Sequence, residues 1–261
     1  MNATIHKIND YVTCINDGWI SVCYVVCGKE KACVIDTVKG HENLKDIVRT
    51  ITDLPLVVVN THGHIDHIYG NSFFEKAYIH ADDVEIHDRA FAQKQAATKE
   101  QVDQFGATEE YYKWYISCGP CPLEFTKPGD VFDLGGITLE VVNLRGHTKG
   151  SIGLLDKKGG LFFSGDALNI ELWMQLPDST SLREMQETLR NLEPYRPFIK
   201  ELHTGHNVEK IDPSMIDQII ECVDDLYENG GENDEMMNWF MGKSPAHRFK
   251  NACILYNPER L

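Results

Sequence analysis

A short apolar segment that runs directly into a histidine-rich loop limits the folds available to this chain. Residues 55–60 (P-L-V-V-V-N) are apolar and of strand length, and residues 61–67 (T-H-G-H-I-D-H) follow without a break. A short apolar run of this kind is consistent with a buried strand. The sequence therefore predicts a buried strand whose C-terminal end presents four side chains with metal-ligand chemistry, those of His62, His64, Asp66 and His67.

The other expected elements form two groups of strands. β-Branched and aromatic runs between polar or glycine turns predict strands, and helical spacing of apolar residues predicts helices. No low-complexity tract or long linker divides the chain, so we expect one domain over residues 1–261, with two β-rich halves covered by helices. The expected strands are 10–17, 19–28, 31–37, 55–60, 131–133, 137–143, 151–155, 160–164, 198–203 and 252–256; the expected helices are 41–52, 180–193 and 213–228, with a mostly helical, aromatic-rich insert over about residues 82–127.

Charge and composition argue against several classes of protein. The net charge is −15, and because such a surface repels phosphate backbones we expect no nucleic-acid partner. The first residues show no basic segment followed by an apolar one, and the apolar run near the start is too short to cross a bilayer, so we expect no secretory signal and no membrane partner. Without an export signal, the eight cysteines are expected to be reduced thiols in a cytoplasmic protein.

The histidine-rich loop has the spacing of a metal site. His62 and His64 lie two residues apart, and residues i and i+2 of an extended segment point the same way, so both imidazoles can reach one cation. Asp66 and His67 lie one turn further on and can face a second cation. Imidazole and carboxylate together suit zinc, and iron or manganese as well. The alternative, a polar loop whose histidines cap a helix or titrate freely, does not explain three histidines and an aspartate within six positions.

Three further strand ends carry candidate ligands. Each candidate follows an expected strand and lies in a turn of small residues: His147 in G-H-T-K-G, Asp166 in S-G-D-A, and His203 and His206 in H-T-G-H. Two cations need more ligands than the first loop supplies, and these residues can provide them. Because one carboxylate can bridge two metals, Asp166 is the natural shared ligand.

Together these motifs resemble the metallo-β-lactamase superfamily. The resemblance rests on H-x-H-x-D-H, G-H-T-x-G, S-G-D and a late G-H, and it runs from about residue 19 to residue 206. It implies an α/β fold, a four-layer αββα sandwich with a dinuclear metal site at one edge. The implied ligands are His62, His64 and His147 for the first metal, Asp66, His67 and His206 for the second, and Asp166 as the bridge.

Details of the motifs favour one branch of the superfamily. The bridging residue is Asp166 rather than the cysteine of some zinc β-lactamases, and T-H-G-H-I-D-H-I-Y-G-N is close to a thioesterase-type pattern. His64 stands where the flavin-dependent diiron oxygen reductases carry glutamate, and the basic arms of the nucleases are not evident. The chain thus resembles hydroxyacylglutathione hydrolases and lactonases. Within the same resemblance, His206 is preferred to His203 because it stands in the G-H pair, and Asp36 supports the metal loops without binding metal.

The implied ligand set predicts a metal-dependent hydrolase. Two divalent cations, zinc first and iron or manganese as alternatives, can share a water and lower its pKa to roughly 7. We expect the bridging hydroxide to attack a small ester, thioester or lactone, with Asp66 as the catalytic residue that orients the water or receives its proton. Thr61 and Asp36 are expected to hydrogen-bond imidazole N–H groups. A phosphodiesterase for a small or lipid-like phosphate, a diiron oxidoreductase, and assembly into a homodimer are left open.

Three other stretches have more than one interpretation. Cys118 and Cys121 spell C-G-P-C, but such a motif needs a preceding strand and a following helix, so we expect incidental loop cysteines rather than a redox pair, a disulfide or metal ligands. The aromatic residues of 111–115 are expected in the core, along the substrate pocket or at a dimer contact. Trp173 and Met174 are expected either at the pocket mouth or in the core.

Overall fold

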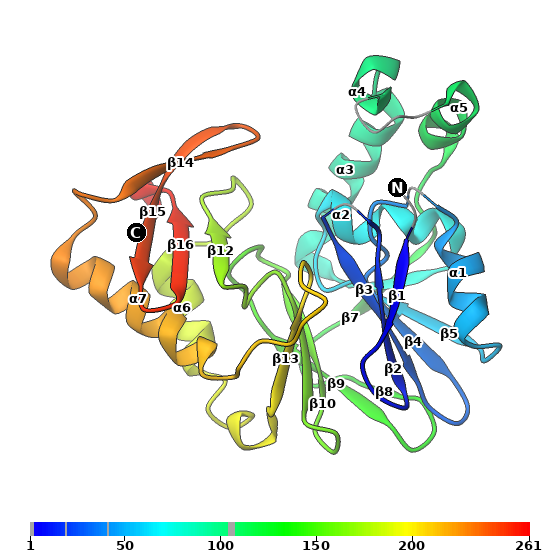
Figure 1. The fold of residues 1–261 in the computed structure, drawn as a ribbon, viewed down its shortest axis with the longest axis horizontal. Coiled ribbons are helices and arrows are strands. Elements are labelled where there is room, and N and C mark those ends of the chain that lie inside the picture. Colours follow the sequence, from blue (N-terminus) through cyan, green and yellow to red (C-terminus); the bar gives the residue numbers. More distant parts are fainter. Residues whose placement is uncertain (1–2, 19, 41, 104–107) are drawn as a thin grey trace.

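The chain folds around two β-sheets that pack face to face (Figure 1). The computed structural model describes residues 3–18, 20–40, 42–103 and 108–261; Trp19 and His41, where the sequence predicts the start of a strand and of a helix, lie outside the described residues. The first sheet has the strand order β1-β2-β3-β4-β5-β6-β7, and the second has the order β13-β11-β10-β9-β8. Their strands are β1 (Thr4–Lys7), β2 (Val12–Asn16), β3 (Val22–Cys27), β4 (Ala32–Ile35), β5 (Leu56–Val59), β6 (Ala77–His80), β7 (Leu123–Thr126), β8 (Val131–Asp133), β9 (Thr138–Asn143), β10 (Ile152–Asp156), β11 (Leu161–Gly165) and β13 (Glu201–Thr204).

The space between the two sheets is an apolar core. β3 and β10 are buried along nearly their whole length, which is typical of strands covered on both faces. Tyr24 of the first sheet and Phe163 of the second belong to this core, with ring centroids 5.0 Å apart. Each large apolar side chain buried here contributes about 1.5–3 kcal/mol. This contact fixes the ends of the strands of one sheet relative to those of the other.

Helices cover the outer faces of both sheets, so the α/β sandwich expected from the sequence is confirmed. One helix packs on the first sheet and two pack on the second. In the first turn of α6, Ser181 and Glu184 form a capping box, which satisfies backbone N–H groups that a helix leaves free. Among the described residues, no helix combines the length and apolar character needed to span a membrane. The three covering helices are α1 (Leu44–Ile51), α6 (Leu182–Arg190) and α7 (Met215–Asn229).

A third sheet, which the sequence did not predict, packs against α6 and α7 (Figure 1). Its strands pair in the order β12-β16-β15-β14, and apolar side chains of β12 and β16 share one core with the two helices. Of these strands the sequence predicted only β16. β14 has no buried residue, β15 is only partly buried, and neither carries a continuous apolar run. The strands are β12 (Glu171–Met174), β14 (Glu235–Trp239), β15 (Gly242–Phe249) and β16 (Ala252–Tyr256).

The insert at residues 82–127 projects from the first sheet as a group of helices (Figure 1). It contains α3 (Val84–Ala96), α4 (Lys99–Asp103) and α5 (Glu109–Ser117), while residues 104–107 lie outside the described part of the chain. The insert is mostly helical, as expected, but its last segment forms β7, a strand that the sequence did not predict. That segment, L-E-F-T, pairs in parallel with β6, and a strand defined by its partner carries little signal of its own.

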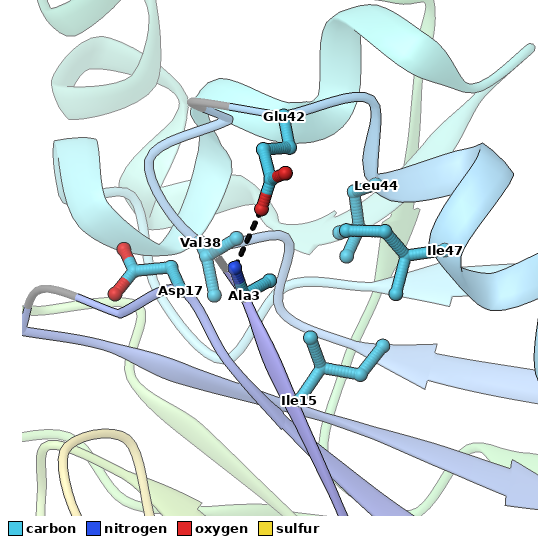
Figure 2. Close-up of a pocket in the computed structure, with 7 residues that line it drawn as sticks. All are labelled: Ala3, Ile15, Asp17, Val38, Glu42, Leu44 and Ile47. Atoms are coloured by element: carbon cyan, nitrogen blue, oxygen red, sulfur yellow. Dashed lines mark hydrogen bonds between the residues drawn. The ribbon is translucent and has the colours of Figure 1, made fainter. Parts of the chain in front are cut away.

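The N-terminal residues complete the packing of α1 against the first sheet. Figure 2 shows the side chains that meet there, and the backbone N–H of Ala3 donates to Oε2 of Glu42 at 2.6 Å. The remaining space is only about 10 Å³, roughly the volume needed to admit one water molecule. This region therefore stabilises the fold and does not provide a ligand site.

Candidate metal centre and substrate cavity

Four strand ends bring seven polar side chains together at one edge of the two main sheets. The first sheet supplies four of them through the loop after β5 and the short helix α2 (Ile65–Ile68). The second sheet supplies three through the turns after β9, β11 and β13. The structure thus gathers every candidate ligand that the sequence singled out for the two metals. They are His62, His64, Asp66, His67, His147, Asp166 and His206.

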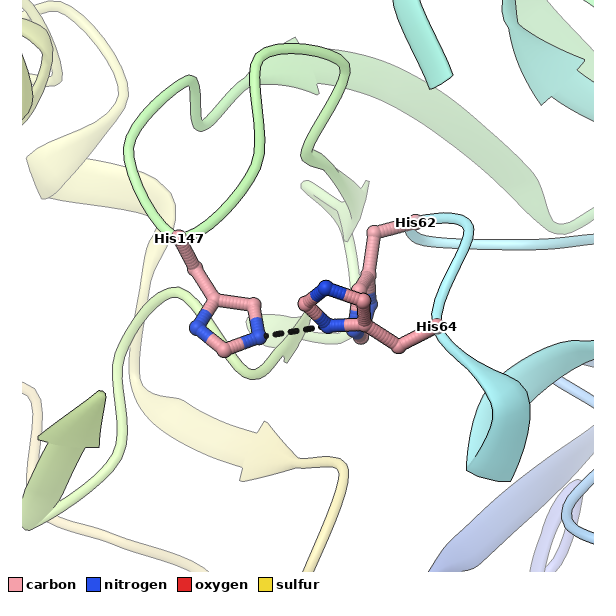
Figure 3. A group of neighbouring side chains, drawn as sticks. All are labelled: His62, His64 and His147. Carbon is pink, nitrogen blue, oxygen red and sulfur yellow. Dashed lines mark hydrogen bonds between the residues drawn. The ribbon is translucent and has the colours of Figure 1, made fainter. Parts of the chain in front are cut away.

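Three histidines form one cluster, which Figure 3 shows. His62, His64 and His147 each offer a ring nitrogen within 4.8 Å of the other two. Nδ1 of His64 lies 2.9 Å from Nε2 of His147. The rings of His62 and His64 are nearly perpendicular, at 88°, with centroids 4.8 Å apart. Imidazole nitrogens that converge from different directions form a donor set suited to zinc.

Asp66, His67 and His206 form a second cluster, and Asp166 lies between the two. Oδ2 of Asp66 is 3.7 Å from Nε2 of His67 and 3.7 Å from Nε2 of His206. Oδ2 of Asp166 is 2.9 Å from Nε2 of His206 and 3.6 Å from Nε2 of His147. Its other oxygen, Oδ1, is 3.4 Å from Nε2 of His67. One carboxylate thus contacts both clusters.

Buried polar atoms without hydrogen bonds face into the clusters. Within the described residues, Nε2 of His62, Nε2 of His67 and Oδ1 of Asp166 are buried and make no hydrogen bond. An unpaired buried polar group costs about 1–3 kcal/mol. A cation coordinated by these atoms would offset that cost, so the residues present fit bound divalent metal ions.

Burial and neighbouring charges shift the pKa values of the side chains in the two clusters. Burial lowers the pKa of His147 to about 4 and holds the pKa of His62 well below its usual value. Burial acts in the same direction on His206, but the Asp166 carboxylate outweighs it and raises the pKa of His206 to about 9. Burial would raise the pKa of Asp166, yet His206 and His67 hold it well below its usual range. Neutral histidines are available as ligands, whereas His206 must release a proton to bind a cation.

Hydrogen bonds on the far side of the rings determine which nitrogen faces the site. Oγ1 of Thr61 donates to Asp36 at 2.8 Å and accepts from Nδ1 of His62 at 3.1 Å. Nδ1 of His67 donates to Oδ2 of Asp36 at 2.9 Å. Because Nδ1 carries the proton, the lone pair of Nε2 points into the site. The contacts of Thr61 and Asp36 are those that the sequence predicted.

Two backbone carbonyl groups, which the sequence did not predict, orient two other rings. Nδ1 of His147 donates to the carbonyl oxygen of Trp173 in β12 at 2.8 Å. Nδ1 of His206 donates to the carbonyl oxygen of Ile20 at 2.5 Å. Every residue has a carbonyl group, so no side-chain pattern could mark these two as part of the site.

Asp83 is a buried carboxylate outside every motif, and it joins the loops of the two sheets. Its side chain accepts hydrogen bonds from the backbone N–H of Gly63 at 2.8 Å, from the N–H of Gly150 at 2.7 Å and from the hydroxyl of Thr148 at 2.7 Å. Gly63 belongs to the H-G-H motif, and the other two belong to G-H-T-K-G. Asp83 therefore sets the separation of the loops that carry the three-histidine cluster. The sequence did not single out Asp83.

Asp83→Ala is expected to lower the free energy of unfolding by about 2–4 kcal/mol, because two buried N–H groups and a hydroxyl lose their acceptor. It is also expected to weaken metal affinity by about 10- to 100-fold, because the cluster loses its alignment. Denaturant unfolding and metal titration measure the two effects. Asp83→Asn, which keeps one acceptor oxygen, should recover part of both, and Asp82→Ala serves as the exposed control. Unchanged metal affinity in Asp83→Ala would show that this contact does not position the ligands.

His203, the alternative late ligand, lies away from the clusters. Its ring is buried between the sheets, stacked on Phe163 with centroids 5.4 Å apart and an interplanar angle of 27°. His206 reaches the site instead, after Gly205. A Cβ atom at Gly205 would lie 2.5 Å from Oδ1 of Asp166 and 2.5 Å from the ring of His67. Only glycine fits so close an approach, which gives the G-H pair its physical basis.

A cavity of about 1150 Å³ opens onto both clusters. It is larger than the roughly 300–1,000 Å³ of most small-molecule sites. Its wall combines candidate ligands such as His64 with apolar side chains such as Ile86 of α3 and Trp173 of β12. Trp173 therefore lies at the pocket, one of its two expected places, whereas Met174 belongs to the core.

Neither the cysteine pair nor the aromatic cluster forms part of this site. Cys118 and Cys121 are free thiols, and burial raises the pKa of Cys121 to about 11, opposite to the activation that a redox motif needs. In the described part of the chain, α5 contributes no side chain to the cavity wall, which is lined by α3 instead. Trp114 of α5 stacks on Phe73 with centroids 5.1 Å apart, so the cluster packs the insert onto the sheet.

The fold and the two clusters define a known class of protein. The model of the metallo-beta-lactamase superfamily matches residues 16–211. A metallo-beta-lactamase from Pontibacter korlensis has a similar structure, with a TM-score of 0.59 at 19% identity over 84% of this chain and 98% of its own. TTHA1623, solved in a di-iron-bound form, has a TM-score of 0.56 at 22% identity over 76% of this chain and 93% of its own. The chain belongs to the metallo-β-lactamase superfamily.

Curated relatives are similar over part of the chain. The acyl-coenzyme A thioesterase MBLAC2 of Gallus gallus is 28% identical over 156 residues, which cover 56% of this chain and 56% of the relative. The hydroxyacylglutathione hydrolase GloC of Haemophilus influenzae is 30% identical over 152 residues, which cover 56% of this chain and 66% of the relative. The chain thus spans little more than half the length of MBLAC2.

Proposed function

We propose that the protein is a dinuclear metal-dependent hydrolase that acts on a small-molecule ester, thioester or lactone. The observation that carries the proposal is the pair of side-chain clusters that share Asp166 at the base of one large cavity. When bound, two divalent cations would lower the pKa of a shared water and polarise the substrate's carbonyl oxygen. Zinc suits these donors best, with iron or manganese as alternatives. We assign His62, His64 and His147 to one ion, Asp66, His67 and His206 to the other, and Asp166 to both.

Within this proposal, Asp66 accepts the proton of the attacking water. Its carboxylate lines the cavity and lies beside Nε2 of His67 and of His206. A carboxylate at the point of attack can accept the proton and pass it to the leaving group. Asp83, Asp36 and Thr61 then act as positioning residues, because they hold ligand loops and rings without facing the substrate.

The character of the cavity favours an acyl substrate over a phosphodiester. Among the described lining residues the cationic side chains are Lys39 and Arg89, and Arg89 is paired with Asp178 at 2.5 Å. A phosphodiester would call for more positive charge around its leaving group. The similarity to a thioesterase and to a hydroxyacylglutathione hydrolase supports the same choice.

Removal of the metal ions is expected to abolish hydrolysis of generic thioesters and nitrophenyl esters. Dialysis against a chelator, followed by elemental analysis and activity assays, tests this. Zinc, manganese or iron should restore activity to different degrees, and up to two equivalents should bind. Bis-nitrophenyl phosphate serves as the comparison substrate and should be hydrolysed more slowly. Full esterase activity in metal-free protein, or a preference for the phosphodiester, would contradict the proposal.

A further inference from the structure

The turn of the β14–β15 hairpin carries two large apolar side chains. Trp239 pairs with Gly242, so Phe240 and Met241 are the two residues of the turn. Turns of this length favour glycine, asparagine and aspartate. Phe240 is 77% exposed and Met241 is 62% exposed, so most of each side chain is in contact with solvent. Turn chemistry does not account for these two side chains.

Both side chains line the cavity that contains the metal clusters. Phe240 stacks on Trp173 with centroids 6.1 Å apart at 28°, and Trp239 meets the edge of Phe240 at 5.2 Å. The carbonyl of Trp173 holds the ring of His147. One wall of aromatic side chains therefore runs from the three-histidine cluster to the tip of the hairpin.

The other sides of the cavity are also apolar at the mouth. Ile20, Ile65 and Ile170 line it, and each is more than a third exposed. Ile86 and Ala90 of α3 lie deeper, where they are buried. Exposed apolar side chains that gather around one opening mark a binding surface, because each loses contact with water when a ligand covers it.

The hairpin lies outside the part of the chain that defines the superfamily. The family model matches residues 16–211, whereas β14 and β15 together cover residues 235–249. The wall that the hairpin builds is therefore formed by residues outside the matched segment. In hydrolases, the elements added around a common reaction centre are where substrate choice is made.

We infer that the β14–β15 hairpin is the specificity element of this cavity, and that Phe240 and Met241 hold the apolar acyl chain of an ester or thioester substrate. The inference rests on the proposed hydrolase function. With the acyl carbonyl group at Asp166, the chain would extend along Trp173 towards the turn. Binding energy from this remote part of the substrate would raise kcat/KM for long acyl chains over short ones.

The test compares decanoyl and acetyl thioesters in the metal-loaded wild type, in the double variant Phe240→Ser with Met241→Ser, and in a matched control. The control, Phe125→Ser with Met236→Ser, removes an exposed Phe and an exposed Met that do not line the cavity. Because each buried methylene favours binding, the wild-type ratio of decanoyl to acetyl kcat/KM should be large. It should fall at least tenfold in the double variant and stay within twofold in the control.

A decyl thioether, which cannot be hydrolysed, gives a second readout through the fluorescence of Trp173 and Trp239. The double variant should bind it at least tenfold more weakly than the wild type. If the double variant binds the thioether at least tenfold more weakly but no acyl substrate is hydrolysed, the hairpin inference stands and the proposed function fails. If wild type hydrolyses both thioesters equally and binds no thioether, the function stands and the inference fails. An unchanged ratio of decanoyl to acetyl kcat/KM in the double variant would also overturn the inference. So would a wild-type dimer that the double substitution dissociates, if this dissociation is its main effect.

Discussion

Asp166→Ala is expected to lose at least one of two bound metal ions and to lower kcat/KM by about 10²- to 10³-fold or more. The physical reason is that the Asp166 carboxylate contacts both clusters, at 2.9 Å from His206 and 3.6 Å from His147. Without it, the positive charges of two ions, or of protonated His67 and His206, would face one another without a bridging anion. Elemental analysis and steady-state kinetics measure the two effects.

The control for this variant must separate metal loss from unfolding. Removing one partner of a buried charged pair typically costs about 3–5 kcal/mol, so thermal unfolding is recorded beside the metal content. Asp166→Asn keeps the shape of the side chain and removes its charge, and it should lose metal with less loss of stability. A folded Asp166→Ala protein with two tightly bound ions would remove Asp166 from the bridging role.

Asp66→Ala is expected to lower kcat by about 10²- to 10⁴-fold, the usual contribution of a positioned general base, with a much smaller change in KM. Asp66 belongs to the second cluster and lines the cavity, so its carboxylate acts where the water attacks and not where the substrate's remote parts bind. Steady-state kinetics at saturating metal would show a loss in kcat and in kcat/KM together.

Asp88→Ala provides the comparison for Asp66, because it removes an exposed carboxylate of α3 that does not line the cavity. Its kinetics should match those of the wild type. Metal content must be measured in both variants, since Asp66 is also assigned as a ligand. If Asp66→Ala raises KM and leaves kcat unchanged, its role is in substrate binding and the proton-transfer assignment is wrong.

Most strands of the two main sheets and all of the ligand motifs were predictable from the sequence because their signals are local, whereas β1, β6 and β7 were missed. A buried strand such as β10 is a continuous run of apolar residues, which can be recognised without knowledge of its neighbours. The motif H-x-H-x-D-H likewise concentrates donor atoms within six positions. The third sheet was not predictable in the same way. β14 has no buried residue and β15 is only partly buried. β14 pairs with β15, β15 pairs with β16, and β16 packs on α7, so the sheet depends on partners distant in the sequence.

The groups that support the site show the same division. Thr61 was predicted because it adjoins the histidine-rich motif, and Asp36 was predicted because the family resemblance implies it. Asp83 was not predicted, because it lies outside every motif and its partners Gly63 and Gly150 are 20 and 67 residues away. A cytoplasmic location, a single domain and the lack of a nucleic-acid partner stay predictions from composition and motifs.

The sequence by itself determined the superfamily, the sandwich of sheets and the seven candidate ligands. The reason is that each ligand motif, a strand-end turn with small residues and donor side chains, consists of consecutive residues. Tertiary structure decided which carbonyl groups orient the rings, which buried carboxylate joins the ligand loops, and which surface faces the substrate. Those choices depend on the packing of one sheet against the other and of the third sheet against α6 and α7. Packing between distant segments is a property of their shared surface, so it is absent from any one stretch of sequence.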